Sequence, residues 1–216
     1  DGDTIELGTG QKVRYLGINA PEVRVRAGPR WIVRPQPCGK EASTFNRSLV
    51  EGKEVQLEYD VDTRDDYGRL LAYVIVDDVL VNGELVKKGL ALVDVRKPNF
   101  KHRSELLHFQ EEAKEHRIGI WAAADRLRIE ADEALEHPDE LALVYGTITS
   151  VNSSRGKVYL HFDGDARSDF TAVIYREHLD VLAPKGQDPR AVFQNRKAQV
   201  YGFIRLMPGP TIIICA

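Results

Sequence analysis

The segment RYLGINAPE, residues 14–22, decides the fold and the chemistry expected of this chain. It places Arg14 eight residues before Glu22, at the end of a short run that alternates polar and apolar residues. Two further motifs accompany it, DGDT at residues 1–4 and DYGR at residues 66–69. Taken singly each motif is ordinary, because Asp-Gly is a common turn dipeptide and an arginine on a strand is usually a surface residue. Together, in this order and spacing, they indicate one site built from arginines and carboxylates.

The residue types in these motifs fit the cleavage of a phosphodiester. Negative charge develops on the phosphate oxygens during attack, and arginine meets it with two parallel hydrogen bonds from a guanidinium that keeps its proton. A carboxylate is needed to take a proton from water, and a hard cation held by oxygen ligands offsets further phosphate charge. The three motifs contain all of these parts, in Asp3, Arg14, Asn19, Glu22 and Arg69.

Length and composition restrict the class of protein. With 216 residues the chain has room for one large domain or two small ones, since a domain takes roughly 100–200 residues. Its 43% hydrophobic and 29% charged residues are close to the average of globular proteins, which excludes a disordered chain and a disulfide framework. No apolar run approaches the roughly 20 residues of a membrane helix, so we expect no membrane span. The chain begins at Asp1 without a methionine, and we expect that an N-terminal piece is absent.

The net charge of −3 hides an uneven distribution of charged residues. Arg24, Arg26, Arg30 and Arg34 fall in a segment that three prolines and a glycine mark as a long loop over residues 23–37. A local basic surface of this kind can bind a polyanion even on a neutral domain. We therefore predict that Arg24 and Arg26 contact substrate, with a merely solvated charged loop as the alternative.

Short alternating runs separated by turn residues dominate about the first ninety residues, which indicates a β-rich fold. Apolar residues recur at helical spacing in three segments, and Asn82 is predicted to cap the second of these helices. Five or six strands with three helices indicate an α+β, mostly β fold in which an OB-type barrel carries the helices. The predicted strands are 4–7, 12–18, 55–59, 70–76 and 79–81, and the predicted helices are 42–50, 82–88 and 104–117.

A second domain is expected in the rest of the chain. Residues 129–140 carry six acids and no base, and we interpret them as an acidic helical linker. Beyond it strand signals return five times, with one short helix at 176–182, which is again what a small OB-like β-barrel requires. We therefore divide the chain into a first domain at 1–128, the linker, and a second domain at 141–216.

One strand of the second domain carries an exposed aromatic pair in this interpretation. Tyr159 and His161 point opposite to Val158, Leu160 and Phe162, because side chains alternate between the two faces of a strand. OB barrels bind single strands by stacking bases on such rings. We expect at most a role in binding nucleic acid or a partner for this domain, since most of its aromatic rings are expected to fill its core.

The motifs are similar to those of the staphylococcal nuclease (thermonuclease) family, over about residues 1–124. The resemblance implies a five-stranded OB barrel with three helices, whose first strand precedes DGDT and is expected to be missing here. It also implies a hydrolase, an endonuclease that cleaves single-stranded or loosened DNA and RNA with Ca²⁺ as cofactor and typically leaves 3′-phosphate ends. Residues 141–216 resemble, more loosely, a small β-barrel extension found in some bacterial proteins. The further matching segments are GKEASTF, DDYGRLLAYV, LVNGELVKKGLALV, KPN at 97–99 and Ile120-Trp121.

Matched position by position, the resemblance implies a role for each site residue. Arg14 and Arg69 correspond to the two arginines that bind the scissile phosphate and stabilise its transition state. Glu22 corresponds to the proposed general base that orients or deprotonates the attacking water. Tyr67, in the same motif as Arg69, is predicted to bind substrate alongside the arginines of the loop.

The implied Ca²⁺ site departs from the reference member of the family. Asp3 corresponds to a carboxylate ligand, and Ala20 corresponds to a position that contributes its backbone carbonyl. Asn19 stands where the reference member has a second aspartate, so the site loses a negative charge and its Ca²⁺ affinity is expected to fall. This departure keeps an alternative open, a catalytically weak or inactive nucleic-acid-binding module of the same fold. No protein partner is evident, and the habit of the family favours export to the medium or the cell envelope.

Overall fold

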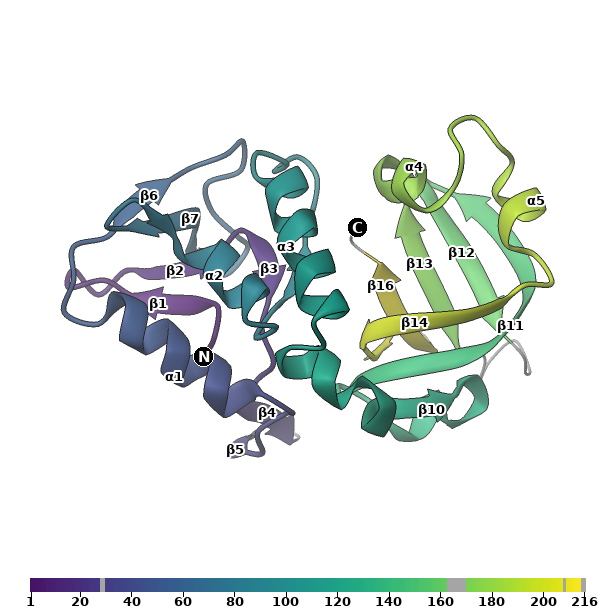
Figure 1. Ribbon diagram of the computed structural model, residues 1–216, viewed down its shortest axis with the longest axis horizontal. Helices are drawn as coiled ribbons and strands as arrows, with labels where there is room; N and C mark the ends of the chain where they lie inside the picture. Colours follow the sequence, from purple (N-terminus) through teal and green to yellow (C-terminus); the bar gives the residue numbers. More distant parts are fainter. Residues whose placement is uncertain (28–29, 163–169, 208, 215–216) are drawn as a thin grey trace. The chain divides into compact units, whose positions relative to one another are not determined.

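The computed structural model describes residues 1–27, 30–162, 170–207 and 209–214, without the side chains at positions 25–27, 31, 123 and 125. Contacts divide the chain into two compact units, Asp1–Ala123 and Ala124–Ala216 (Figure 1). Each unit has its own hydrophobic core. A 3₁₀ segment, η1 (Gly119–Leu127), runs across the boundary. Within the described residues, no helix is long and apolar enough to cross a membrane.

The first unit is built on short strands, most of which join in one sheet. The strands are β1 (Thr4–Glu6), β2 (Lys12–Tyr15), β3 (Gly17–Asn19), β6 (Gln56–Glu58), β7 (Leu70–Val76), β8 (Val79–Leu80) and β9 (Leu92–Asp94). The sheet has the order β1-β2-β7-β6 with β8 on β7, and β3 pairs with β9 separately. β1 and β2 pair antiparallel as a hairpin, and β2 runs parallel to β7 with Arg14 opposite Leu71. The β1–β2 pairing brings the DGDT motif next to Arg14, and the β2–β7 pairing does the same for the DYGR motif.

The three predicted helices are present as α1 (Gly39–Val50), α2 (Val81–Lys87) and α3 (Arg103–Glu115). The prediction that Asn82 caps the second helix is wrong, because α2 begins at Val81 and Asn82 is fully buried inside it. Its Oδ1 accepts a hydrogen bond from the Val74 N–H at 2.9 Å, and its Nδ2 donates to the Leu16 carbonyl at 2.8 Å. The amide thus joins α2 to β7 and to the segment after β2, where backbone groups would otherwise lack partners.

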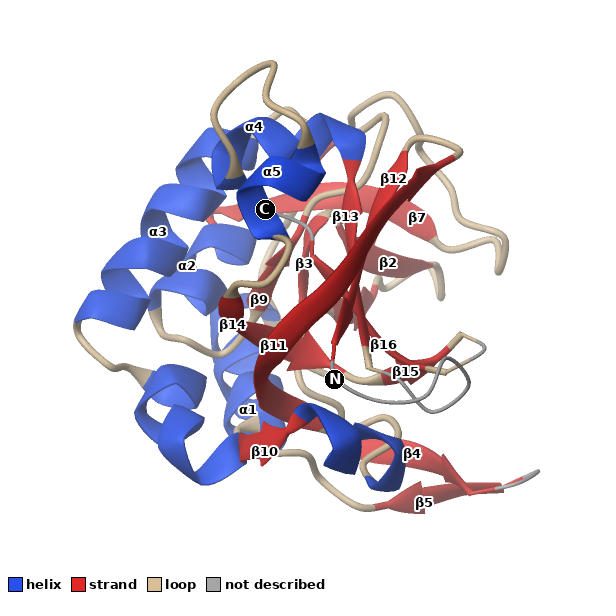
Figure 2. Ribbon diagram, turned by 90° about the vertical axis from the view of Figure 1, so that its right-hand side faces the viewer, coloured by secondary structure: helices blue, strands red, loops and turns tan. Residues whose placement is uncertain are grey.

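Residues 23–37 do not form the long loop expected from their prolines. They form a two-stranded antiparallel arm, β4 (Arg24–Ala27) and β5 (Arg30–Val33), which Figure 2 shows projecting as a separate pair of strands. Arginine alternates with apolar residues in β4, whereas β5 is a short apolar run after Arg30, and these strand signals are the ones that the prolines obscured. The arm therefore carries its arginines on extended backbone.

A histidine links α3 to β6 in the first unit. Nε2 of His102 lies 2.6 Å from Glu58, and Nδ1 lies 2.9 Å from Glu105. Burial lowers the pKa of His102, but the hydrogen bonds to the two glutamates outweigh burial and hold the pKa above its ordinary value. Hydrogen bonds from Lys101 and His102 hold the pKa of Glu58 below its ordinary value. This contact therefore weakens as the pH rises through the raised pKa of His102.

The second unit is a curled sheet with the strand connections of an OB fold. Its elements are β10 (Arg128–Glu130), η2 (Ala131–Glu136), β11 (Leu141–Ser154), β12 (Lys157–Phe162), β13 (Thr171–Tyr175), η3 (Arg176–His178), α4 (Leu179–Leu182), α5 (Pro189–Phe193), β14 (Lys197–Phe203), β15 (Arg205–Leu206) and β16 (Pro210–Ile214). The strand β11 pairs antiparallel with β12 and β14, β12 pairs with β13, and β13 runs parallel to β16. A Cβ on Gly202 would lie 2.6 Å from Cγ2 of Ile212, so β14 and β16 approach closely.

Residues 129–140 are part of the second unit, which differs from the separate linker that their acidic composition indicated. β10 pairs parallel to the start of β11, and η2 follows it directly. Ala131 and Ala134 are buried in the core of this unit, although acids surround them in the sequence. The boundary lies between Ala123 and Ala124, a few residues before the predicted position.

Candidate active site

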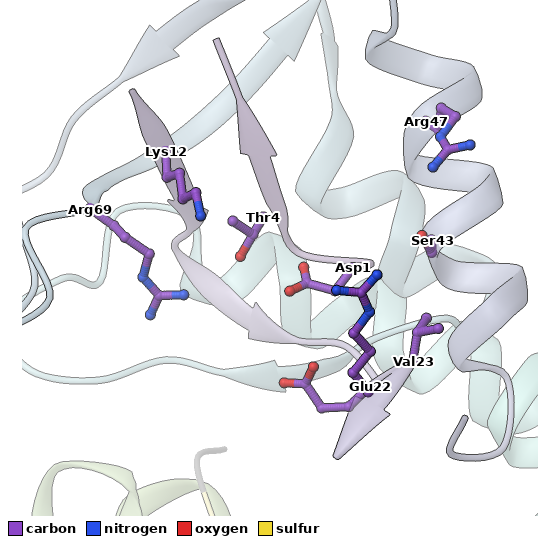
Figure 3. A pocket seen from close by; sticks show the side chains of 9 residues that line it. Asp1, Thr4, Lys12, Glu22, Val23, Ser43, Arg47 and Arg69 are labelled. Carbon is purple, nitrogen blue, oxygen red and sulfur yellow. The ribbon is translucent and has the colours of Figure 1, made fainter. Parts of the chain in front are cut away.

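A cleft of about 660 Å³ in the first unit gathers residues from all three sequence motifs (Figure 3). Its lining side chains come from the segment before β1, from β1 and β2, from the segment between β3 and β4, from β4 and α1, and from the turn before β7. In Figure 3 the carboxylates of Asp1 and Glu22 and the guanidinium of Arg69 face the same space. The lining residues are Asp1, Thr4, Lys12, Glu22, Val23, Arg24, Ser43, Arg47 and Arg69.

Arg14 is held by four acceptors of its own unit. Nη1 donates to the carbonyl oxygens of Tyr15 at 3.0 Å and Ile18 at 2.9 Å. Nη2 donates to Oδ1 of Asn19 at 3.1 Å and lies 3.2 Å from Oδ2 of Asp3. The side chain is only 17% exposed, so the pair with Asp3 is screened less than a surface ion pair. The structure thus brings the predicted residues Asp3, Arg14 and Asn19 together.

Asp3 joins the start of β1 to the segment that follows β3. Its carboxylate is buried, and Oδ2 accepts a hydrogen bond from the Ala20 N–H at 2.7 Å. The preceding Gly2 is required by packing, because a Cβ there would lie 2.7 Å from the Cβ atoms of both Ala20 and Ala42. The DGDT motif therefore presses against α1 and holds its second carboxylate in place.

The oxygen atoms of this cluster are of the kind that Ca²⁺ prefers. Asp3 contributes a carboxylate, Asn19 an amide oxygen, and Ala20 a carbonyl from the residue whose N–H already contacts Asp3. Oδ1 of Asn19 accepts a hydrogen bond from Nη2 of Arg14, and Oδ2 of Asp3 lies beside the same nitrogen. A bound cation would therefore share these two oxygens with the guanidinium. In the part of the chain that the structure describes, no three His, Cys, Asp or Glu residues are grouped to hold a metal ion. The donors fit Ca²⁺ in type, with one formal negative charge.

Glu22 is positioned through its backbone at the beginning of α1. Its N–H donates to Oε1 of Gln36 at 2.7 Å, and the Gln36 N–H donates back to the Glu22 carbonyl at 2.8 Å. Gly39 allows the approach, because a Cβ there would lie 2.7 Å from the Glu22 carbonyl oxygen. The side chain of Glu22 lines the cleft, and its role as the residue that takes a proton stays a prediction.

Asp65 orients the side chain of Arg69 through hydrogen bonds in the turn before β7. Oδ1 of Asp65 accepts the N–H groups of Tyr67 and Arg69, each at 3.0 Å, and Oδ2 accepts Nε of Arg69 at 2.7 Å. Burial alone would raise the pKa of the Asp65 carboxyl, but the hydrogen bonds and the charge of Arg69 more than offset burial, and the pKa lies below its usual range. Because Asp65 binds Nε, the terminal nitrogens of Arg69 extend toward the cleft (Figure 3).

Of the three residues predicted to contact substrate, Tyr67, Arg24 and Arg26, only Arg24 is placed in the cleft by the part of the structure that is described. Tyr67 is 87% exposed and does not line the cleft, and its ring centroid lies 5.7 Å from Cζ of Arg69. Arg24 lines the cleft, whereas the side chain of Arg26 lies outside the part of the structure that is described.

Two basic residues of the cleft, Lys12 and Arg47, were not predicted from the sequence. Lys12 shares a face of β2 with Arg14, and Arg47 follows Ser43 by one turn of α1. The spacing of two between Lys12 and Arg14 in a strand was an available signal, because such residues point to one side. Arg47 carries no comparable signal, since an arginine on the surface of a helix is common.

Comparison with known proteins agrees with this geometry. The family model described as Staphylococcal nuclease homologue matches residues 12–123. The SPbeta prophage-derived endonuclease YokF of Bacillus subtilis (strain 168) is 44% identical over 127 residues, which are 56% of this chain and 41% of that protein. The endonuclease YncB of the same organism is 43% identical over 127 residues, 56% of this chain and 58% of that protein. The thermonuclease of Staphylococcus intermedius is 38% identical over 128 residues, 56% of this chain and 71% of that protein.

This chain therefore spans less than two thirds of YokF and YncB, and the similarity lies in the nuclease-like part. The names of these relatives support the predicted class, a hydrolase acting on nucleic acid. The family model covers more than half of the 216 residues, and it includes Arg14, Glu22 and Arg69. Because this family model matches more than half of the chain, the chain belongs to the family of staphylococcal nuclease homologues.

Proposed function

We propose that the protein is an endonuclease that hydrolyses phosphodiester bonds of single-stranded DNA or RNA, with Ca²⁺ as cofactor. The observation that carries the proposal is the convergence of Glu22 and Arg69 on one cleft from segments far apart in the sequence. A carboxylate and a guanidinium that face one space can act on water and on phosphate at the same time. The basic residues Lys12, Arg24 and Arg47 add positive charge along the same cleft, as a polyanionic substrate requires.

Each site residue has one task in the proposed reaction. Glu22 takes the proton of the water that attacks phosphorus. The terminal nitrogens of Arg69 donate to the phosphate oxygens as negative charge develops on them, and Nε stays bound to Asp65, which fixes the plane of the guanidinium. Asp3, Asn19 and the Ala20 carbonyl would hold the Ca²⁺, whose positive charge offsets that of the phosphate.

Arg14 is the residue on which the alternative function depends. Both of its terminal nitrogens are engaged within the chain, so contact with phosphate requires an exchange of partners. If Asn19 and Asp3 retain the guanidinium, the phosphate gains only one arginine and catalysis is weak. A nucleic-acid-binding module of the same fold is therefore the second candidate function.

The experiment measures acid-soluble nucleotides released from single-stranded DNA and from RNA, with Ca²⁺ or with a chelator. Glu22→Gln is compared with Glu54→Gln, an exposed glutamate outside the cleft. We expect Ca²⁺-dependent cleavage that falls by about 10² or more in Glu22→Gln, because a general base contributes about 10²–10⁴. The control is expected to match the parent. Salt-sensitive binding without cleavage by the parent would favour the binding module.

A further inference from the structure

The second unit has the strand connections of an OB fold, in which β11 is the first strand of the barrel. The second and third strands of the OB fold are therefore β12 and β13. OB folds that bind oligonucleotides do so on the face formed by these two strands. In this unit β12 pairs antiparallel with β13 over five residues, from Lys157 opposite Tyr175 to His161 opposite Thr171. A surface of this kind binds a single strand when its outward side chains are aromatic rings, which stack on bases, and basic groups, which contact phosphates.

The outward side of β12 is aromatic and basic. Val158, Leu160 and Phe162 are buried, so the predicted alternation is present, but Tyr159 and His161 are half-buried and not exposed as the sequence predicted. The two rings are nearly parallel, with an angle of 8° between their planes and 6.5 Å between their centroids. Bases stacked on such rings share an orientation, as successive bases of one strand do.

Neighbouring side chains contact two rings of this surface, those of His161 and Tyr175. Nδ1 of His161 lies 3.1 Å from Oγ1 of Thr171 on β13, so a hydrogen bond holds the imidazole ring. At the other end of β12, Nζ of Lys157 lies 4.9 Å from the ring centroid of Tyr175, the residue opposite it. The platform is therefore ordered before a ligand arrives, which lowers the entropic cost of binding.

Positive charge gathers at one end of this platform. Arg155 occupies the turn between β11 and β12, and Arg176 follows β13 directly and donates its N–H to the Gly156 carbonyl at 2.9 Å. Both arginines are exposed, and Lys157 lies beside them. In the described parts of the chain, none of the three forms an ion pair with an acidic residue. Their charge is therefore available to phosphate.

We propose that this surface, the β12–β13 face, binds single-stranded nucleic acid as a second, non-catalytic site. Its aromatic residues supply stacking platforms and its basic residues contact the phosphates, the combination by which OB folds bind single strands without sequence preference. The binding does not depend on hydrolysis in the cleft. The β12–β13 face consists of Arg155, Lys157, Tyr159, His161, Thr171, Tyr175 and Arg176.

Another aromatic site of the same unit provides a matched control. A cavity of about 500 Å³ between β10, β11 and β14 contains Tyr145, whose ring centroid lies 4.0 Å from Cζ of Arg128. A hydrogen bond to Glu130 raises the pKa of Tyr145, so a carboxylate lies at the tip of this ring. One face of the ring is thus occupied and the neighbouring negative charge repels phosphate. Tyr145→Ala removes a tyrosine of the same unit without touching the β12–β13 face.

The test uses the full chain carrying Glu22→Gln, in chelator, so that binding is measured without cleavage. Fluorescence anisotropy with labelled oligo(dT), oligo(U) and a DNA duplex yields a Kd for each at several salt concentrations. The two single strands distinguish DNA from RNA as the ligand. Cleavage by the parent without the Glu22 change is measured separately, so that the proposed nuclease and this site can fail independently.

We expect Tyr159→Ala to weaken single-strand binding about tenfold, because the loss of one stacked base weakens binding by about 5- to 150-fold. The double change Arg155→Gln and Lys157→Gln should reduce the slope of log Kd against log salt by about 0.7 for each phosphate that no longer meets a positive side chain. The Tyr145→Ala control is expected to bind like its parent. On titration with oligo(dT), the ring protons of His161 should shift upfield as a base stacks on them.

Three results would overturn the proposal. The first is a Kd within about twofold of the parent in both Tyr159→Ala and the Arg155/Lys157 double variant. The loss of a stacked base would change the Kd by more than that. The second is an equal loss in Tyr145→Ala. The third is the absence of binding to either single strand. The double variant changes only side chains at the surface end of β12, so it decides the matter even if Tyr159→Ala does not fold.

Discussion

Gly39→Ala tests whether the backbone at the start of α1 positions the general base. Two effects oppose each other in this change. Alanine stabilises the middle of a helix by about 0.5–1 kcal/mol relative to glycine, and at the first residue of α1 the gain is at most that. The new Cβ, however, would lie 2.7 Å from the Glu22 carbonyl oxygen and 3.1 Å from that of Pro21. Both are backbone atoms that cannot rotate away, and overpacking of this kind costs about 1–3 kcal/mol. The clash therefore outweighs the gain in helix propensity, and we expect a net loss of stability of about 1–2 kcal/mol.

The same clash moves Glu22, and its effect on catalysis is the sharper test. A misplacement of about 1 Å can cost about 10² in rate, so a shift of roughly half that distance should lower kcat by about tenfold. Urea unfolding and steady-state cleavage of single-stranded DNA measure the two effects. Gly8→Ala is the control, because a Cβ at Gly8 meets no atom within 4 Å. If Gly39→Ala is as stable and as active as Gly8→Ala, this approach of backbone to backbone does not position Glu22.

Three further predictions concern charge. Asn19→Asp adds a second carboxylate to the proposed metal site and should lower the Ca²⁺ concentration that gives half-maximal cleavage, measured by titration; an unchanged or higher value would contradict the assigned ligands. Asp65→Ala releases Nε of Arg69, held at 2.7 Å, and should lower kcat about tenfold while circular dichroism stays unchanged, because the guanidinium loses its fixed plane. The pKa of His102 is raised, so its interaction with Glu58 contributes fully below the unfolded pKa of about 6.5 and disappears as pH rises through the folded value. The lowered pKa of Glu58 maintains its contribution until the pH falls below about 4.3. The urea midpoint of the parent should therefore exceed that of His102→Gln most between about pH 4.3 and 6.5, and a difference that does not vary with pH would refute this.

Motif reasoning predicted the family and the meeting of Glu22 with Arg69, because the chemistry of a phosphodiester restricts which residue types can act together. The partners that aim these side chains were not predicted. Asp65 and Gln36 act through backbone geometry that depends on the turn and on the beginning of α1, and neither leaves a periodic signal. Gly39 has the same character, since only the folded chain shows which carbonyl it approaches.

The errors had a common cause, which was that composition outweighed spacing. Prolines near residues 23–37 concealed two short strands, and acids in 129–140 concealed a pair of alanines three residues apart that face the second core. Asn82 was assigned to a helix end by its residue type, although its amide is used in the interior. In each case the burial of a few atoms determined the outcome, and burial follows from contacts between distant segments.

The presence of two separate hydrophobic cores affects how the chain melts. Two cores in one chain are two cooperative units, and a single free energy of unfolding is then not defined. A ligand that binds only the native first unit raises the midpoint of that transition alone, and a ligand of the second unit raises the other. A calorimetric scan with a mononucleotide, a metal ion or a single strand would thus report which unit holds it, without any substitution. Where the transitions separate, a sample heated between them retains the property of one unit and loses that of the other.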